Sequence, residues 1–330
     1  MACEEQNCGS VAAEAIEHAP RGGDDGDDAH KMHQAALKEA GAEIINRANS
    51  RGLRIAGWVI QARKGAILKM DARERLEKIL GTPHLPEMVF GDSSLELVHE
   101  ASGIRIHFNA LDALHGWRQE SLPPVEVPAA AKWKFRSKPN QEVILDYDYT
   151  FTTPYRGSDE CLQVEEEEEE ERQLTPNGVV EWVQSSEKID MVALQARDPI
   201  LFYDEVVLYE DELADNGVAL LSVKVRIMPS CWYLLLRFWL RVDGVLMRLR
   251  DTRMFSRFRS VDGDDPSEKK KKTPVVIREL CDKEDTFHAL ALRGLTSDPA
   301  MYSDPSVAGE KLQLQRQFCE KLRLISNFKQ

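Results

Sequence analysis

The sequence predicts an α+β fold: a single large domain built on antiparallel β-sheets, sandwich-like, with short flanking helices. The main observation is the stretch 220–255, which is the most apolar and the most regularly patterned part of the chain. From Leu221 to Ile227 apolar and polar side chains alternate, the period of a strand with one buried face. The second observation is that short segments with helix-capping residues are interspersed among such strands. Together these patterns favour a β-rich domain with few, short helices.

A hairpin is predicted at the centre of this stretch. One apolar run, Cys231–Val242, ends directly at Asp243 and Gly244, and a second apolar run follows. Asp-Gly in this setting favours a two-residue turn, in which both central residues have positive φ. Such a turn pairs Val242 with Val245, Leu240 with Met247, Phe238 with Leu249, Leu236 with Asp251, Arg241 with Leu246, Trp239 with Arg248, and Arg237 with Arg250.

In this predicted register the hairpin has two unlike faces. One face is aliphatic and ends at an acid, Asp251. The other is a charged face formed by Arg237, Trp239, Arg241, Arg248 and Arg250. Arginines directly opposite each other repel, so we expect nearby acids to neutralise them, in particular the acids at 205 and 210–212. Binding of another acidic protein by this face is the alternative.

The N-terminal part of the chain supplies shorter elements. Residues 1–52 are predicted to be a disordered or partly helical extension, with a helix over 29–46, and the main domain is expected to span 53–330. Short strands are expected from Leu53 to Met70, with Trp58 in the core. Asp71 is expected to cap a helix that Gly81 ends.

Further elements follow along the chain. Alternation predicts a second hairpin over 95–108, and Asn109 is expected to cap a short helix that contains Asp112. A mobile acidic loop is predicted at about 159–178, because the seven consecutive glutamates of 165–171 repel one another. Asp190 is expected to cap a helix over 191–197.

The last third of the chain is less regular. A strand is expected over 200–209, an edge strand at 275–277, and a terminal helix from Pro305 onward. The four lysines of 269–272 fit either a charged hairpin tip or a nuclear localisation patch.

Charge and motifs exclude several classes of function. The formal net charge is −13, which argues against a general nucleic-acid surface. No apolar run approaches the roughly 18 residues of a membrane span. The chain has no phosphate-binding glycine loop, no nucleophile elbow and no paired-cysteine zinc pattern, and His99 and His107 lack a third ligand at a suitable spacing. We therefore predict no cofactor and no metal site, and we nominate no catalytic nucleophile or base. An enzyme whose catalytic residues are scattered along the chain stays open at this point.

Several blocks, in order along the chain, resemble the TIPRL family of TOR-signalling regulators. They are LPEMVFGD, FNALDAL, DYDYTFTTPY, LYEDELADNGV, SVKVRIMPS, LLLRFWLRVDGVL and RDTR. The resemblance implies a non-catalytic protein that binds the catalytic subunits of type 2A, 4 and 6 serine/threonine phosphatases, including their C-terminal tail, and modulates their activity in TOR signalling. It also implies that the tail-binding positions are Asp112, Ile189, Leu249 and Asp251.

The residues themselves are consistent with such a site. Leu249 and Asp251 are two positions apart on one predicted strand and share a face, where a carboxylate requires a donor. Asp112 and Ile189 lie at predicted helix starts. We expect these four residues to line one cleft with apolar walls and two carboxylates. We expect the free protein to be monomeric and cytoplasmic, and the lysine run leaves a nuclear location open.

Overall fold

A computed structural model describes residues 26–82, 85–115, 118–119, 125–127, 143–145, 151–162, 176–258 and 273–326. Within them one antiparallel sheet of 14 strands dominates the fold. In sheet order it runs β1-β2-β3-β5-β6-β11-β12-β18-β17-β16-β15-β14-β13-β4. Its strands are β1 (Glu43–Arg47), β2 (Ser50–Ile55), β3 (Trp58–Arg63), β4 (Met88–Val89), β5 (Ser94–His99), β6 (Ile104–Asn109), β11 (Ser158–Leu162), β12 (Pro176–Gln184), β13 (Phe202–Asp211), β14 (Gly217–Ile227), β15 (Cys231–Val242), β16 (Leu246–Arg257), β17 (Ile277–Thr286) and β18 (Gln313–Ser326).

Short elements surround this sheet. Two small strand pairs are formed by β7 (Arg118–Gln119) with β10 (Phe151–Thr152) and by β8 (Val125–Val127) with β9 (Val143–Leu145). The helices are α2 (Gly26–Glu39), α3 (Met70–Leu80), α4 (Ala110–His115), α5 (Met191–Gln195), η2 (Leu213–Asp215), α6 (Phe287–Leu292), η3 (Pro299–Tyr302) and α7 (Pro305–Lys311). This architecture confirms the predicted α+β class. None of the helices in the described ranges is long and apolar enough to cross a membrane.

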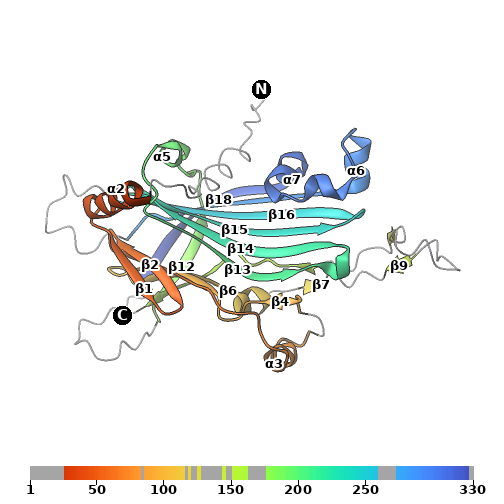
Figure 1. The fold of residues 1–330 in the computed structure, drawn as a ribbon, viewed down its shortest axis with the longest axis horizontal. Coiled ribbons are helices and arrows are strands. Elements are labelled where there is room, and N and C mark those ends of the chain that lie inside the picture. Colours follow the sequence, from red (N-terminus) through yellow and green to blue (C-terminus); the bar gives the residue numbers. More distant parts are fainter. Residues whose placement is uncertain are drawn as a thin grey trace.

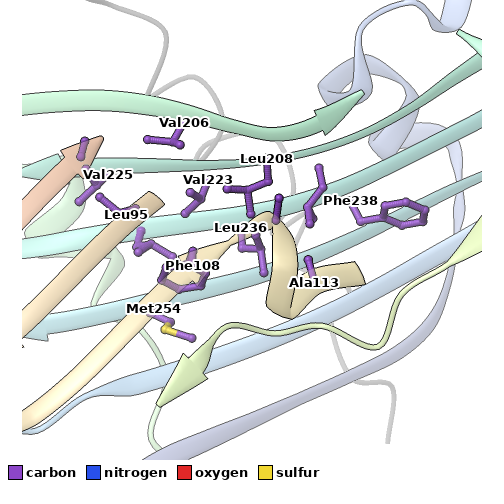
Figure 2. Packing of buried hydrophobic residues seen from close by; sticks show 14 of the residues in the cluster. Leu95, Phe108, Ala113, Val206, Leu208, Val223, Val225, Leu236, Phe238 and Met254 are labelled. Atoms are coloured by element: carbon purple, nitrogen blue, oxygen red, sulfur yellow. The ribbon is translucent and has the colours of Figure 1, made fainter. Parts of the chain in front are cut away.

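The sheet bends so that its two halves enclose one core. Strand β13 contacts both β3 and β5, which lie far from it in the sheet order. The buried cluster between the halves joins side chains of β5 and β6, such as Leu95 and Phe108, to Val223 of β14 and Leu236 and Phe238 of β15 (Figure 2). Trp58 belongs to the same cluster, as predicted. The fold is therefore sandwich-like, although one continuous sheet supplies both layers.

Strand β15 alternates between this core and the opposite side of the sheet. We call the side that faces the core the inner face and the opposite side the outer face. Helix α5 lies over one end of the outer face and α6 and α7 lie over the other end (Figure 1). Each end has its own buried cluster, which includes Tyr233 and Leu235 with α5 and Trp239 and Leu249 with α6 and α7.

The predicted hairpin exists, but its predicted register is wrong. Val242 pairs with Leu246, so the loop has three residues and every pair is shifted by one. Gly244 has φ 77°, whereas the φ of Asp243 is not positive. A two-residue type I′ turn requires positive φ at both positions. Val245 N instead donates to Val242 O at 2.9 Å and its side chain is buried.

The shift divides the predicted charged face between two sides of the sheet. Arg237 now pairs with Asp251, and Trp239 pairs with Leu249. Arg241 pairs with Met247, and these three pairs lie on the outer face. Arg248 pairs with Leu240, and Arg250 pairs with Phe238, on the inner face. The expectation that these two arginines share a face with the other three charged-face residues, Arg237, Trp239 and Arg241, is therefore wrong.

Three of these arginines form ion pairs with acids other than those at 205 and 210–212. Arg237 binds Asp251 and Arg241 binds Asp243. Arg248 binds Glu284, and an Nη of Arg250 donates to the Thr153 carbonyl at 3.0 Å.

Several predicted elements differ from the structure at their ends. Helix α2 stops at Glu39, and Ile44 lies in strand β1, so the expected helix over 29–46 is wrong in its second half. Lys69, and not Asp71, is the N-terminal flanking residue of α3. The boundary proposed at 52/53 falls within β2, which pairs with β1 and β3.

The C-terminal prediction fails most clearly. The expected edge strand is β17, which lies between β16 and β18. The expected terminal helix ends at Lys311, and residues 313–326 form β18 between β17 and β12. The glutamate run 165–171, the lysine run 269–272 and residues 1–25 of the N-terminal extension lie outside the described residues.

Candidate partner-binding site

The clearest polar feature of the outer face is a buried ion pair. Arg237 of β15 donates from Nε to Asp251 Oδ1 at 2.8 Å and from Nη2 to Asp251 Oδ2 at 2.9 Å. Arg253 Nη2 lies 3.4 Å from the same Oδ2. The Asp251 side chain is only 3% exposed. Two guanidinium groups therefore contact one carboxylate. That of Arg237 forms the two parallel hydrogen bonds that arginine favours with carboxylates.

The protonation of Asp251 follows from these contacts. Burial alone would raise the pKa of the carboxyl, because the charged form loses its hydration. The positive charges and hydrogen bonds of Arg237 and Arg253 outweigh this effect and hold the pKa of Asp251 below its ordinary value. Asp251 is thus a charged carboxylate at neutral pH.

The ion pair is continued toward α5. Arg253 pairs in register with Glu279 of β17, and Glu279 Oε1 accepts a hydrogen bond from the Ile189 backbone N–H at 2.8 Å. Ile189 immediately precedes Asp190, whose side chain caps α5 by accepting from Ala193 N, as predicted. One polar row thus connects the start of α5 to the centre of β16.

Leu249 lies two residues from Asp251 on the same face. It is 4% exposed and packs with Trp239 and Phe287, and with Ala308 of α7. The sequence prediction that Leu249 and Asp251 share a face is therefore confirmed. Ile189, also buried, joins them on this outer face through the polar row.

Asp112 lies apart from the other three predicted residues. It is in the first turn of α4, whose Ala113 packs beside Leu236 and Phe238 of the inner face (Figure 2). The expectation that both carboxylates line one cleft with Leu249 is therefore wrong, because β15 and β16 separate them. The cause is the hairpin register, which turns Asp251 toward the outer face.

The Asp112 carboxylate has its own set of donors. Its Oδ2 accepts from Ser158 Oγ at 2.7 Å and from Asn109 Nδ2 at 2.9 Å, and it lies 3.0 Å from His107 Nε2. Burial raises the pKa of Asp112, but these hydrogen bonds and the histidine together lower it below its ordinary value. The side chain is 40% exposed, so this carboxylate is accessible to a partner in the structure as it stands.

Three further residues of the outer face were not predicted from the sequence. Arg253 and Glu279 extend the ion pair. Tyr233 lies beside them with its hydroxyl buried, and this burial is the main reason that the pKa of the hydroxyl is raised to about 12. The RDTR block contains Arg253. Only the correct strand register could have shown that Glu279 lies next to it.

The described residues contain no group of three His, Cys, Asp or Glu side chains that could hold a metal ion. The site offers charged contacts from Arg237 and Asp251 and apolar contacts from Leu249. A face of this composition is suited to binding a peptide or protein segment.

Comparison with known proteins identifies the family. The model of the TIP41-like family matches residues 88–291, which extend from the start of β4 into α6. A TIP41-like protein of Arabidopsis thaliana is 55% identical over 292 residues, which cover 88% of this chain and 96% of that protein. The chain therefore belongs to the TIP41-like family, which confirms the TIPRL resemblance.

More distant relatives share the same description. A TIP41-like protein of Homo sapiens is 36% identical over 268 residues, which cover 80% of this chain and 86% of that protein. A Saccharomyces cerevisiae protein named type 2A phosphatase activator TIP41 is 34% identical over 224 residues, which cover 62% of this chain and 58% of that protein.

Proposed function

We propose that this protein is a non-catalytic regulator that binds the catalytic subunits of type 2A-class serine/threonine phosphatases, those of types 4 and 6 included. The yeast relative named type 2A phosphatase activator supports the phosphatase class. In this proposal the protein acts in TOR signalling in the cytoplasm, with a nuclear location left open, and is monomeric when free.

The observation that carries the site assignment is the polar row on the outer face. It connects three of the four residues that the family resemblance implies: Ile189 through Glu279, and Asp251 with its neighbour Leu249 through Arg253. We assign the phosphatase tail to this face. Asp112, exposed on the other side of β15 and β16, is assigned to a separate contact with the body of the catalytic subunit.

The alternative, a scaffold that binds an acidic protein through an arginine face, has less support. The side chains of Arg237 and Arg248 are only 14% and 5% exposed, and both bind acids of this chain. Because the arginines lie on two sides of the sheet, no single surface presents all of them.

A binding assay tests the proposal. Purified protein is titrated with purified catalytic subunits of the type 2A, 4 and 6 classes and with that of an unrelated serine/threonine phosphatase. We expect the first three to bind and the fourth to bind at least about tenfold more weakly, a difference of about 1.4 kcal/mol. Equal affinity for all four, or no binding, would overturn the proposal.

Two variants then locate the contacts. Asp112→Asn removes a charge from an accessible carboxylate and is expected to weaken binding of the whole catalytic subunit but not of its isolated tail peptide. Glu181→Gln, which removes a charge from an exposed position on β12, is the matched control. If the two variants bind the catalytic subunit equally well, Asp112 is not a contact.

A further inference from the structure

Leu249 is covered by a short segment of its own chain. Gly309 of α7 lies so close that a Cβ at this position would be 2.7 Å from Leu249 Cδ2. Ala308, Tyr302 and Leu312 complete the same buried cluster. A partner residue can reach Leu249 only if residues 303–311, which we call the cover, move away from β16.

The cover is held to the sheet by few contacts. Its polar contacts in the described residues are a hydrogen bond from Arg237 Nη1 to Ser306 Oγ at 3.1 Å and one from Lys283 Nζ to the Gly309 carbonyl at 2.5 Å. Its buried residues are small, Ala308 and Gly309, whereas Val307 is 46% exposed. Because small side chains bury little apolar area, lifting the cover exposes little of its own surface to water.

The helix within the cover is also weak. Helix α7 has seven residues, and isolated helices shorter than about 12 residues are marginal in water. Val307 and Gly309 are both poor helix formers. The local stabilising contact is the Asp304 side chain, which accepts from Ser306 N at 2.7 Å. The helix therefore depends on its contact with the sheet.

The segments on both sides of the cover are anchored independently. Before it, Arg241 Nη1 donates to the carbonyls of Pro299 and Tyr302, and Tyr302 Oη donates to the Thr296 carbonyl at 2.7 Å. After it, Leu312 is buried and the chain enters β18. The cover can thus leave as a unit while its two ends stay in place.

A buried donor lies beneath the cover without an acceptor. Trp239 pairs with Leu249 across β15 and β16 and is 1% exposed. Its indole Nε1 makes no hydrogen bond within the part of the chain that the structure describes. Buried N–H groups are nearly always satisfied, because an unsatisfied one loses its hydration without replacement. A carbonyl of an incoming chain would supply the acceptor that the cover does not.

We propose that residues 303–311 are a displaceable cover, and that an extended peptide takes their place on Leu249 with a main-chain carbonyl accepting from Trp239 Nε1. The inference rests on the proposed function, because it takes the phosphatase tail as this peptide. Lifting the cover also frees Arg237 Nη1 from Ser306, so that Arg237 Nη1 and Trp239 Nε1 are two donors on β15 for main-chain carbonyls of the peptide.

Cover variants test the proposal without changing the sheet beneath. The variant Ser306→Ala removes the bond to Arg237 and leaves the contact of α7 with Leu249 unchanged. The matched control, Ser303→Ala, alters an exposed position of the same segment. Each protein is titrated with a fluorescent synthetic peptide of the phosphatase C-terminal tail. We expect the loosened variant to bind at least about threefold more tightly and the control to match wild type.

Hydrogen exchange supplies a second readout. Adding the tail peptide to the wild-type protein is expected to speed exchange of the α7 amides, because the cover leaves the sheet. Trp239→Phe removes the N–H donor and leaves a smaller aromatic ring in a buried site, so it is expected to cost some stability. Under conditions in which both proteins are fully folded, it is expected to weaken peptide binding about fivefold.

The outcomes separate this inference from the function on which it rests. Slower α7 exchange on binding, or a loosened variant that binds no more tightly than wild type, would overturn the cover. Both results leave phosphatase binding intact. A wild-type protein that binds neither catalytic subunit nor tail peptide would overturn both proposals.

Discussion

Arg237 and Asp251 face each other across β15 and β16 and form two parallel hydrogen bonds, of 2.8 and 2.9 Å, on a buried part of the outer face. In this pair two charges that the fold buries neutralise each other, so any change at Asp251 is expected to affect stability.

Replacement of Asp251 by asparagine is expected to destabilise the protein by about 3–5 kcal/mol, because the buried Arg237 loses the carboxylate that binds it. Urea unfolding measures the change. Glu181→Gln serves as the surface control and is expected to stay within about 0.5 kcal/mol of wild type. An Asp251→Asn protein as stable as this control would show that the pair contributes no net stability.

The contribution of Asp251 is expected to depend on pH in one direction. Its pKa is lower in the folded state than in the unfolded chain, where it is about 3.9. The stabilisation is therefore complete above that value and is lost as the pH falls through the lower, folded pKa. Unfolding of wild type and Asp251→Asn, compared from about pH 7 to about pH 2, should give a difference that shrinks only at the acidic end. A difference that also shrinks between neutral pH and the unfolded pKa would contradict this assignment.

Truncation of Leu249 tests the packing under the cover. Leu249→Ala is expected to cost about 2–5 kcal/mol, because the side chain is buried among the α6 and α7 contacts. Leu249→Met keeps the volume and is expected to cost less than about 1.5 kcal/mol. Thermal and urea unfolding measure both. Equal stability of the two variants would mean that the cover collapses onto the truncated site at no cost.

The hairpin turn offers a test of the backbone conformation at Gly244. Gly244 has φ 77°, a conformation that costs an L-residue about 1–2 kcal/mol. Gly244→Ala should therefore destabilise the protein by about this amount. Gly244→Asn is expected to cost less, because asparagine enters the left-handed region more readily. If alanine and asparagine have the same effect, the turn is not the source of the strain.

Strand identity along β13 to β16 could be predicted from the sequence, because side-chain alternation is a local property. The hairpin register could not be, since it depends on whether Asp243 adopts a positive φ, and Asp-Gly permits either turn. A shift of one residue exchanges the two faces of a strand. This single difference moved Asp251 from the predicted aliphatic face to the side of Arg237.

The C-terminal strand was missed for a different reason. Leu312, Phe318, Leu322 and Ile325 have a spacing that suits a helix, whereas the pairing of β18 with both β12 and β17 determines the observed strand. The partners of β18 lie far from it in sequence, so no local pattern identifies them. No local pattern identifies the polar row either, because the Ile189 N–H that binds Glu279 is 90 residues away from it in the sequence.

The central place of β18 has a practical consequence for anyone who shortens this protein. The span matched by the family model, 88–291, ends before β18 begins. A fragment limited to that span would lose the strand that bridges β12 and β17, and two strands in the middle of the sheet would expose unpaired backbone groups. Such a fragment would tend to associate edge to edge, so recombinant work on the phosphatase contact requires the chain through at least residue 326.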